Sequence, residues 1–107
     1  MNKEQLRQHL LPPEVQKDLP PLYATEKIED PEVKIKYFVP WGSWTWFVTE
    51  GSPEEDDDDF RFFGLVDGHE KELGYFVLSD LMSVTGPGGL TIERDLYFKP
   101  QPLSKFK

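Results

Sequence analysis

Residues 33–49 read VKIKYFVPWGSWTWFVT, and this stretch decides the fold. Residues 33–39 and residues 44–49 both alternate in side-chain polarity or size along the chain. Such alternation is typical of a strand that buries one face, because successive side chains of a strand point to opposite sides. Between the two runs, Pro-Trp-Gly-Ser at 40–43 has the composition of a turn. The stretch therefore predicts a β-hairpin.

Further strands are predicted after this hairpin. Residues 60–66 and 73–78 are rich in aromatic and aliphatic side chains, and residues 67–72 between them read as a turn. A last extended segment is predicted over residues 90–98. Strands that follow one another through short links pair with their neighbours. The predicted fold class is α+β, with a curved antiparallel sheet of four to five strands in a meander and short N-terminal helices packed on it.

Short helices are predicted outside the sheet. Residues 4–11 and 14–19 favour helix, and each run is stopped by a pair of prolines. Ser79 is predicted to cap a third short helix over residues 79–84.

Apolar side chains fall on both faces of the predicted sheet. One set includes Tyr37, Phe62 and Tyr75, and the other includes Phe47 and Phe63. Both faces therefore need cover. The N-terminal helices are expected to cover one face, and the C-terminal segment is an alternative cover for the second.

The length of 107 residues predicts one domain over residues 1–107. Within it we expect a helical segment over residues 1–21, a sheet core over 33–98 and an acidic loop over 50–59. The chain has no cysteine, which excludes disulfides and thiolate metal sites, and neither a cofactor nor a metal site is predicted. Without an apolar leader or a membrane-length apolar run, the protein is expected to be cytoplasmic and to have no membrane partner.

The net charge of −8 is concentrated in the predicted acidic loop. Residues 50–59 hold seven of the 20 acidic residues and no basic one, which leaves 13 acidic against 12 basic residues elsewhere. A run of carboxylates steers association with a positively charged surface. We therefore predict a protein partner with a basic surface, such as a host protein that binds nucleic acid. The candidate contacts are Glu54, Glu55, Asp56, Asp57, Asp58 and Asp59.

Other interpretations of the acidic run remain open. Aspartate oxygens suit a divalent cation, although the spacing does not match a calcium-binding loop. The run is also compatible with a solvated hairpin tip that binds nothing. Direct nucleic-acid binding is not expected, because no basic stripe is present.

Trp41 joins the candidate partner contacts, because it lies in the predicted turn and is expected to be the most exposed of the three tryptophans. Packing in the core or against the hairpin is the alternative for this cluster.

Arg94 suggests a different function. In a strand over residues 90–98 its guanidinium would share a side with apolar residues, where it needs a carboxylate or a bound anion. The predicted ion-pair partners are Glu72, Glu93 and Asp95. The alternative is a small enzyme or ligand-binding domain with an anion site formed by Arg94, Glu93 and Asp95.

Five blocks of sequence resemble a known family. They are LPPLYATE at 19–26, SWTWFVTE at 43–50, FGLV at 63–66, ELGYF at 72–76 and IERDLYF at 92–98. In this order and spacing they resemble the small bacterial proteins grouped as domain of unknown function 2958, over roughly residues 19–103. The resemblance implies an accessory protein of plasmids, integrated elements or phages, and it implies no catalytic residues. The insert at 52–59 and the long N-terminus depart from the family pattern.

The sequence thus predicts a non-enzymatic interaction module of a bacterial mobile element or phage, which inhibits a host defence or DNA-processing protein. The domain with an anion site at Arg94 is the alternative. Neither partner identity nor oligomeric state follows from the residues.

Overall fold

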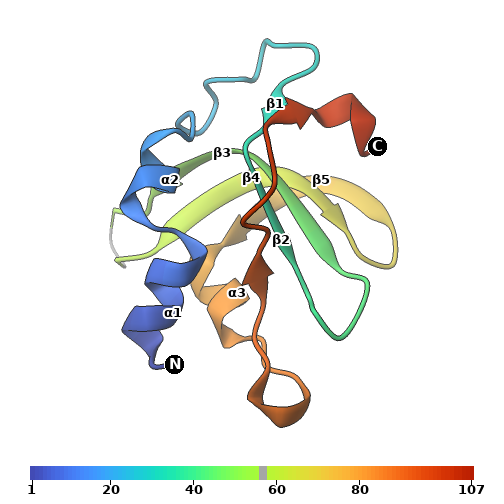
Figure 1. Ribbon diagram of the computed structural model, residues 1–107. Helices are drawn as coiled ribbons and strands as arrows, with labels where there is room; N and C mark the ends of the chain where they lie inside the picture. Colours follow the sequence, from blue (N-terminus) through green and yellow to red (C-terminus); the bar gives the residue numbers. More distant parts are fainter. Residues whose placement is uncertain (56–57) are drawn as a thin grey trace.

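The computed structural model describes residues 1–55 and 58–107 and contains a five-stranded antiparallel sheet. Its strands are β2 (Ile35–Phe38), β3 (Thr45–Pro53), β4 (Phe60–Asp67), β5 (Lys71–Val77) and β6 (Glu93–Arg94). Their order in the sheet is β5-β4-β3-β2-β6, so four sequential strands form a meander and β6 pairs with β2 (Figure 1). The predicted α+β class with an antiparallel sheet is confirmed.

Short elements surround this sheet. A second, two-stranded sheet pairs β1 (Glu32–Val33) with β7 (Gln101–Pro102). The helices are α1 (Lys3–Leu10), α2 (Pro13–Lys17) and α3 (Leu78–Ser83), and single 3-10 turns are η1 (Pro87–Gly89) and η2 (Leu103–Lys105). Within the described residues, no helix has the length and apolar character needed to cross a membrane.

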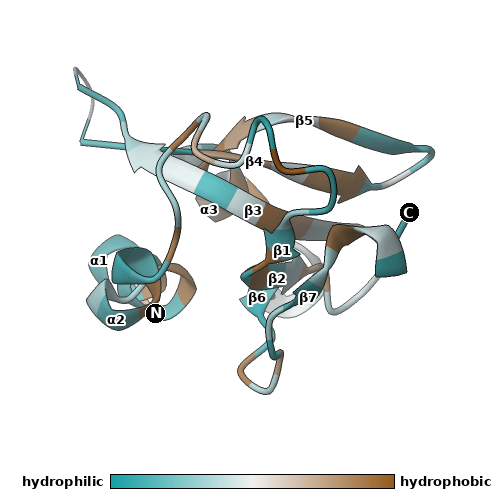
Figure 2. Cartoon of the chain, turned by 90° about the horizontal axis from the view of Figure 1, so that it is seen from above, coloured by the Kyte–Doolittle hydropathy of each residue, from teal (hydrophilic) through white to brown (hydrophobic). Residues whose placement is uncertain are grey.

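One face of the sheet packs against α1 and α3, and we call it the helix face (Figure 2). Burying one large apolar side chain stabilises a fold by roughly 1.5–3 kcal/mol, so this cluster provides most of the hydrophobic stabilisation. Its buried members from the sheet, the helices and the links are Leu6, Leu10, Leu11, Leu19, Ile35, Tyr37, Val39, Trp46, Val48, Phe60, Phe62, Leu78, Leu81 and Ile92.

The opposite face, which we call the loop face, has thinner cover. Phe47 and Leu65 pack there with Val33 and Leu103, and Phe106 stacks on Phe47 with ring centroids 4.3 Å apart. The cover comes from the C-terminal segment and from residues 20–31, which cross above the sheet. Both covers that the sequence suggested are therefore present, one on each face.

The pairing of β3 with β4 has one irregularity, which changes the face on which the next residues of β3 lie. Val48 pairs with Gly64, whereas Glu50 pairs with Phe63, so Thr49 is an extra residue in a β-bulge. A side chain could not be added at position 64, because its Cβ would lie 1.9 Å from the Phe47 carbonyl oxygen. The bulge brings the Glu50 side chain onto the loop face, opposite Phe63.

Three expectations about the elements are corrected by the structure. Tyr75 lies on the loop face, because β5 pairs Phe63 with Tyr75 and places Phe76 beside Phe62 on the helix face. The alternation of side chains shows which residues of one strand share a face. Which residues of β5 lie on the same face as a given residue of β4 depends instead on the turn at 67–70. The extended segment at 90–98 shrinks to β6, since the chain turns at Asp95.

The third correction concerns the acidic loop expected at 50–59. Strand β3 runs on to Pro53 and pairs with Phe60, so the first four residues of that range belong to the sheet. The connection between the strands is accordingly residues 54–59. Within it, Asp56 and Asp57 lie outside the described residues.

A buried tyrosine ties the helix face to α1. The Tyr37 hydroxyl donates to the Leu10 carbonyl oxygen at 2.7 Å, and the Tyr37 side chain is fully buried. Burial raises the pKa of the Tyr37 hydroxyl, so the folded protein retains this proton in alkaline solution.

We expect Tyr37→Phe to lower the free energy of unfolding by about 1–3 kcal/mol, because the Leu10 carbonyl loses its buried partner. In the wild-type protein, stability should also fall as pH rises above about 10, since the unfolded chain releases the Tyr37 proton there and the folded chain does not. Urea denaturation of both proteins at neutral and alkaline pH measures the two effects. The same loss of stability with pH in both proteins would contradict this assignment.

Candidate functional site

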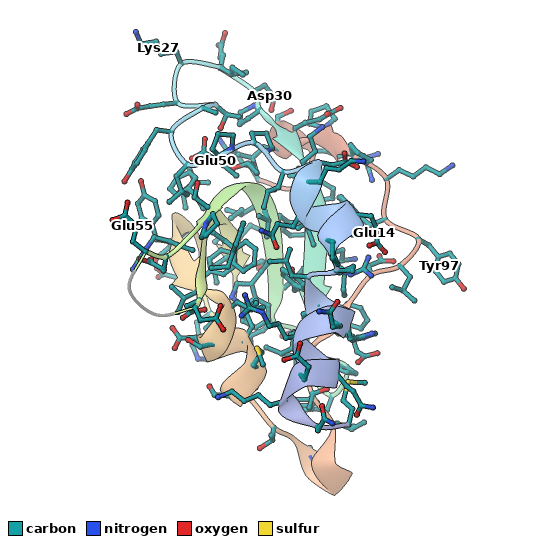
Figure 3. All side chains as sticks on the ribbon, turned by 90° about the vertical axis from the view of Figure 1, so that its left-hand side faces the viewer. Glu14, Lys27, Asp30, Glu50, Glu55 and Tyr97 are labelled. Carbon is teal, nitrogen blue, oxygen red and sulfur yellow. The ribbon has the colours of Figure 1, made fainter. Side chains whose placement is uncertain are left out.

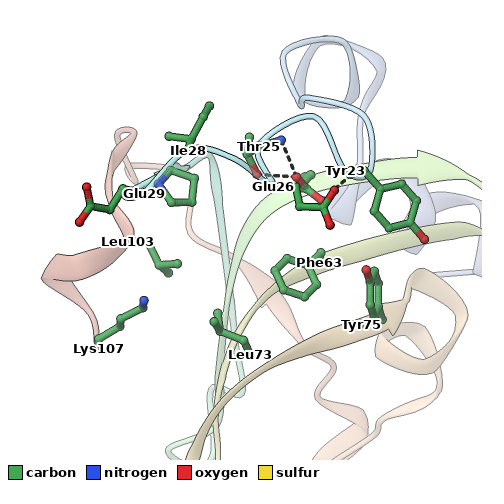
Figure 4. A pocket seen from close by; sticks show the side chains of 12 residues that line it. Tyr23, Thr25, Glu26, Ile28, Glu29, Phe63, Leu73, Tyr75, Leu103 and Lys107 are labelled. Atoms are coloured by element: carbon green, nitrogen blue, oxygen red, sulfur yellow. Dashed lines mark hydrogen bonds between the residues drawn. The ribbon is translucent and has the colours of Figure 1, made fainter.

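The most promising site is a pocket on the loop face. It has a volume of about 300 Å³ and lies between residues 23–31 and strands β3, β4 and β5. Tyr23 and Tyr75 stand at one end, Leu103 and Lys107 at the other, and Phe63 and Leu73 form its floor (Figure 4). The lining residues are Tyr23, Thr25, Glu26, Ile28, Glu29, Pro31, Glu50, Phe63, Leu73, Tyr75, Leu103 and Lys107, and we call this hollow the loop-face pocket.

A row of side chains across three strands builds the pocket wall. Glu50 pairs with Phe63, and Phe63 pairs with Tyr75. Directly paired residues of an antiparallel sheet project on the same side and touch. The Phe63 and Tyr75 rings accordingly lie 4.9 Å apart between centroids.

Glu50 holds the other wall in place. Its side chain is 4% exposed, and its carboxylate accepts hydrogen bonds from the Tyr23 and Thr25 amides, each at 2.8 Å. The Thr25 hydroxyl donates to the same carboxylate. Tyr23 adopts a left-handed backbone conformation with φ of 73°, which is uncommon for a residue with a side chain and needs such support. The Glu50 carboxylate thus fixes the segment that carries the Tyr23 ring.

Further hydrogen bonds fasten this segment at both ends. The Leu22 amide donates to the Ser52 hydroxyl at 2.9 Å. At the far end, the Ser104 amide and hydroxyl donate to Asp30 at 2.9 and 2.7 Å. These two donors lower the pKa of the Asp30 carboxyl, so it stays ionised. Residues 22–30 are therefore attached to β3 and to η2, with the pocket between these attachments.

The pocket is negatively charged and partly apolar. Its lining contains three carboxylates, Glu26, Glu29 and Glu50, against the ammonium of Lys107. Partial burial, the neighbouring Tyr23 hydroxyl and the charges of Glu50 and Glu26 raise the pKa of the Tyr75 hydroxyl. Aromatic faces and carboxylates both attract cations. The arrangement is suited to an ammonium or guanidinium group with an apolar stem.

A larger hollow, of about 600 Å³, lies between α1, α3 and the acidic loop. Its polar groups are already engaged, because Arg7 donates to the Asp58 carbonyl oxygen at 3.0 Å and Asp59 binds the first turn of α3. It also mixes charges of both signs, with Lys3 and Arg7 facing two aspartates. This hollow is a weaker candidate than the loop-face pocket.

The structure divides the acidic residues predicted to contact a partner. Asp59 accepts hydrogen bonds from the Ser79 amide and hydroxyl at 3.0 and 2.6 Å, and Glu54 pairs with Arg61. Ser79 was expected to be the cap of α3; instead, Asp59 provides the capping carboxylate. Glu55 and Asp58 are exposed. Figure 3 shows Glu55 projecting from the molecule on the same side as Glu50.

Trp41 is not the exposed tryptophan. It is half-buried and packs against the helix-face cluster, and a Cβ at Gly86 would lie 2.5 Å from its ring. Trp44 is more exposed, at 38%, and meets His69 edge to face with ring centroids 5.5 Å apart. Trp41 is half-buried although it lies in the turn, because residues 84–86 pass over its ring.

The three residues of the predicted anion site have separate contacts. Arg94 donates from Nε to the His9 carbonyl oxygen at 3.1 Å, and Glu93 lies 3.4 Å from His9 Nε2. Asp95 lies 3.9 Å from the Lys36 ammonium. Arg94 and Asp95 line one shallow hollow without Glu93. The expected ion pairs of Arg94 are replaced by a bond to the last turn of α1, because β6 lies beside that helix.

Sequence reasoning did not identify the loop-face pocket. Glu50 was assigned to a loop, and Tyr75 to the helix face. Tyr23 lies in a stretch that had no predicted structure. The signal that could have found Glu50 is its position at the end of an apolar alternating run, where a carboxylate on a sheet needs partners. In residues 1–55 and 58–107, no three His, Asp or Glu side chains gather closely enough to hold a metal ion.

Comparison with known proteins gives a family and no closer relative. A family model described as "Protein of unknown function (DUF2958)" matches residues 4–107. Neither the curated proteins nor the solved structures include a significant match. The match includes every residue of the loop-face pocket, and it begins nearer the N-terminus than the five blocks in the sequence indicated.

We expect Asp59→Asn to destabilise the protein by about 0.5–2 kcal/mol, because α3 loses a charged cap. Burial alone would raise the pKa of the Asp59 carboxyl, but the hydrogen bonds from Ser79 and Phe60 outweigh it, so the pKa is lowered. The unfolded state then binds the proton first as pH falls, and the stability from Asp59 is lost in acid. Denaturation between neutral pH and about pH 3 measures this.

The matched control is Asp58→Asn, which removes the same charge from an exposed neighbour in a left-handed conformation that asparagine tolerates. It should leave stability nearly unchanged. Equal destabilisation by both substitutions would show that charge in the loop, and not the cap, matters.

Proposed function

Because this chain belongs to DUF2958, a family of proteins of unknown function, its role must be inferred from its own surface, and we propose that it is a non-enzymatic protein-interaction module. Its partner presents a basic surface. The loop-face pocket is the main contact, and it receives a lysine or arginine side chain of that partner.

The observation that supports this proposal is the combination of rings and carboxylates in one hollow. Tyr23 is 62% exposed and Tyr75 is 48% exposed, although Glu50 binds the Tyr23 amide and β4 pairs with Tyr75. Exposed aromatic side chains that are held rigid are typical of contact surfaces, because they bury area at little cost in conformational entropy. The carboxylates beside them select for positive charge.

The acidic loop has a supporting role in this proposal. Glu55 and Asp58 are exposed, and Figure 3 shows Glu55 projecting from the molecule on the same side as Glu50. Together with the net charge of −8 they produce a field that speeds the approach of a basic protein. Such steering weakens as salt is added, because the screening length is about 8–10 Å at physiological ionic strength.

We favour an interaction module over an enzyme for a chemical reason. Thr25 and Glu50 are the one hydroxyl and carboxylate pair of the pocket that resembles a nucleophile with its base. However, the Glu50 carboxylate also accepts from two backbone amides, so its oxygens are committed to holding the segment. The carboxylate therefore has a structural role, and this favours an interaction module.

The biological setting of the proposal comes from the sequence. Because the resemblance of the five sequence blocks implies an accessory protein of a mobile element, we favour a cytoplasmic partner that handles DNA, such as a host defence protein. Proteins of this kind carry basic surfaces for phosphate contacts. Blocking such a surface is a simple way to inhibit them.

Affinity capture from a bacterial host lysate, with tagged wild-type protein and two variants, tests this function. We expect the wild-type protein to retain a stoichiometric partner that Tyr75→Ala loses by at least tenfold, about 1.4 kcal/mol of binding free energy. Tyr97→Ala is the matched control, because Tyr97 is 91% exposed and projects from another side of the molecule (Figure 3). Retention of the same proteins by all three would rule out the pocket as the contact.

A further inference from the structure

Strand β5 has one free edge. It is the terminal strand of the five-stranded sheet, and in the described part of the chain it pairs with β4. Figure 2 shows β5 at the outer limit of the sheet, with the helices on one side of it. On the free side, every second residue of β5 turns its N–H and C=O groups toward solvent.

The same strand borders the loop-face pocket. Leu73 and Tyr75 are each 48% exposed and line the pocket, while Gly74 between them faces the other way. A Cβ added at Gly74 would meet no atom within 4 Å, so the helix face of the sheet is uncovered at this position. At the middle of β5 both faces of the edge strand are therefore open to a partner.

We propose that the partner binds as an extended basic segment that adds to the free edge of β5, with its alternate side chains entering the loop-face pocket. This inference rests on the function proposed above and specifies how that contact is made. Main-chain hydrogen bonds to β5 would provide affinity, and the pocket would select lysine or arginine at every second position.

Charge decides between this occupant and a second copy of the chain. Two copies paired through β5 would bring together two molecules that each carry a net charge of −8. They would also bring Glu26, Glu29 and Glu50 of both pockets toward the same interface. Like charges across an interface oppose association, whereas a basic segment is attracted to the same surface.

The accessible part of the edge is short. Helix α3 begins at Leu78 and closes one end, and the charged Lys71 occupies the other. Charges at the end of an edge strand discourage uncontrolled pairing. About five residues of β5, from Glu72 to Phe76, are then available to a partner strand of similar length.

A synthetic octapeptide of alternating arginine and valine tests the proposal, with affinity measured by fluorescence anisotropy. Two derivatives carry N-methyl groups, one on the arginines and the other on the valines. Since only alternate residues of an added strand donate to β5, we expect one derivative to bind at least tenfold more weakly and the other to bind like the parent. The changes are confined to the peptide, so the fold of the protein is not at issue.

The other possible results would contradict the strand addition alone or the pocket function as well. If the two derivatives bind alike while Tyr75→Ala still weakens the parent peptide, side chains alone make the contact; strand addition is then wrong and the interaction module stands. If the parent peptide does not bind, or binds Tyr75→Ala equally well, the pocket function fails together with this inference. A stable dimer of the protein with protected β5 amides would assign the edge to a second copy and overturn the proposal.

Discussion

The Glu50 carboxylate, bound by the Tyr23 and Thr25 amides, is the interaction on which the loop face depends. A buried charge is costly unless hydrogen bonds replace its water, and here three donors replace it. The β-bulge at Thr49 brings the carboxylate to this side of the sheet. Tyr23, whose amide binds the carboxylate, has a left-handed backbone conformation. Without this carboxylate, residues 22–28 would lose the hydrogen bonds from Tyr23 and Thr25 that hold them above β3.

The two faces of the sheet have different roles in the structure. The helix face carries the larger buried cluster and the buried hydrogen bond from Tyr37 to α1, so it provides stability. The loop face leaves Leu73 and Tyr75 partly uncovered beside a charged pocket. Separation of this kind lets a small domain keep an exposed apolar surface, because the loss of cover on one face does not remove the core on the other.

The alternating runs predicted the strands, the meander and the α+β class because the central strands β2, β3 and β4 each bury at least one face. The same runs could not predict which face Tyr75 occupies, since that depends on the turn at 67–70. Arg94 was expected to need a counter-group and Asp59 to contact another protein, but the groups that they meet, the His9 carbonyl and Ser79, are distant in the chain. The pocket was missed for the same reason, because its walls join residue 23 to residue 75 across the sheet.

Hydrogen exchange of the Tyr23 and Thr25 amides, followed by NMR in the wild-type protein and in Glu50→Gln, tests this dependence most directly. Glutamine keeps the size of the side chain but offers one acceptor oxygen where the carboxylate offers two. We predict that at least one of the two amides exchanges tenfold or more faster in the variant, about 1.4 kcal/mol, while amides of the β2–β3 pair are unchanged. Identical exchange of both amides in the two proteins would contradict the account.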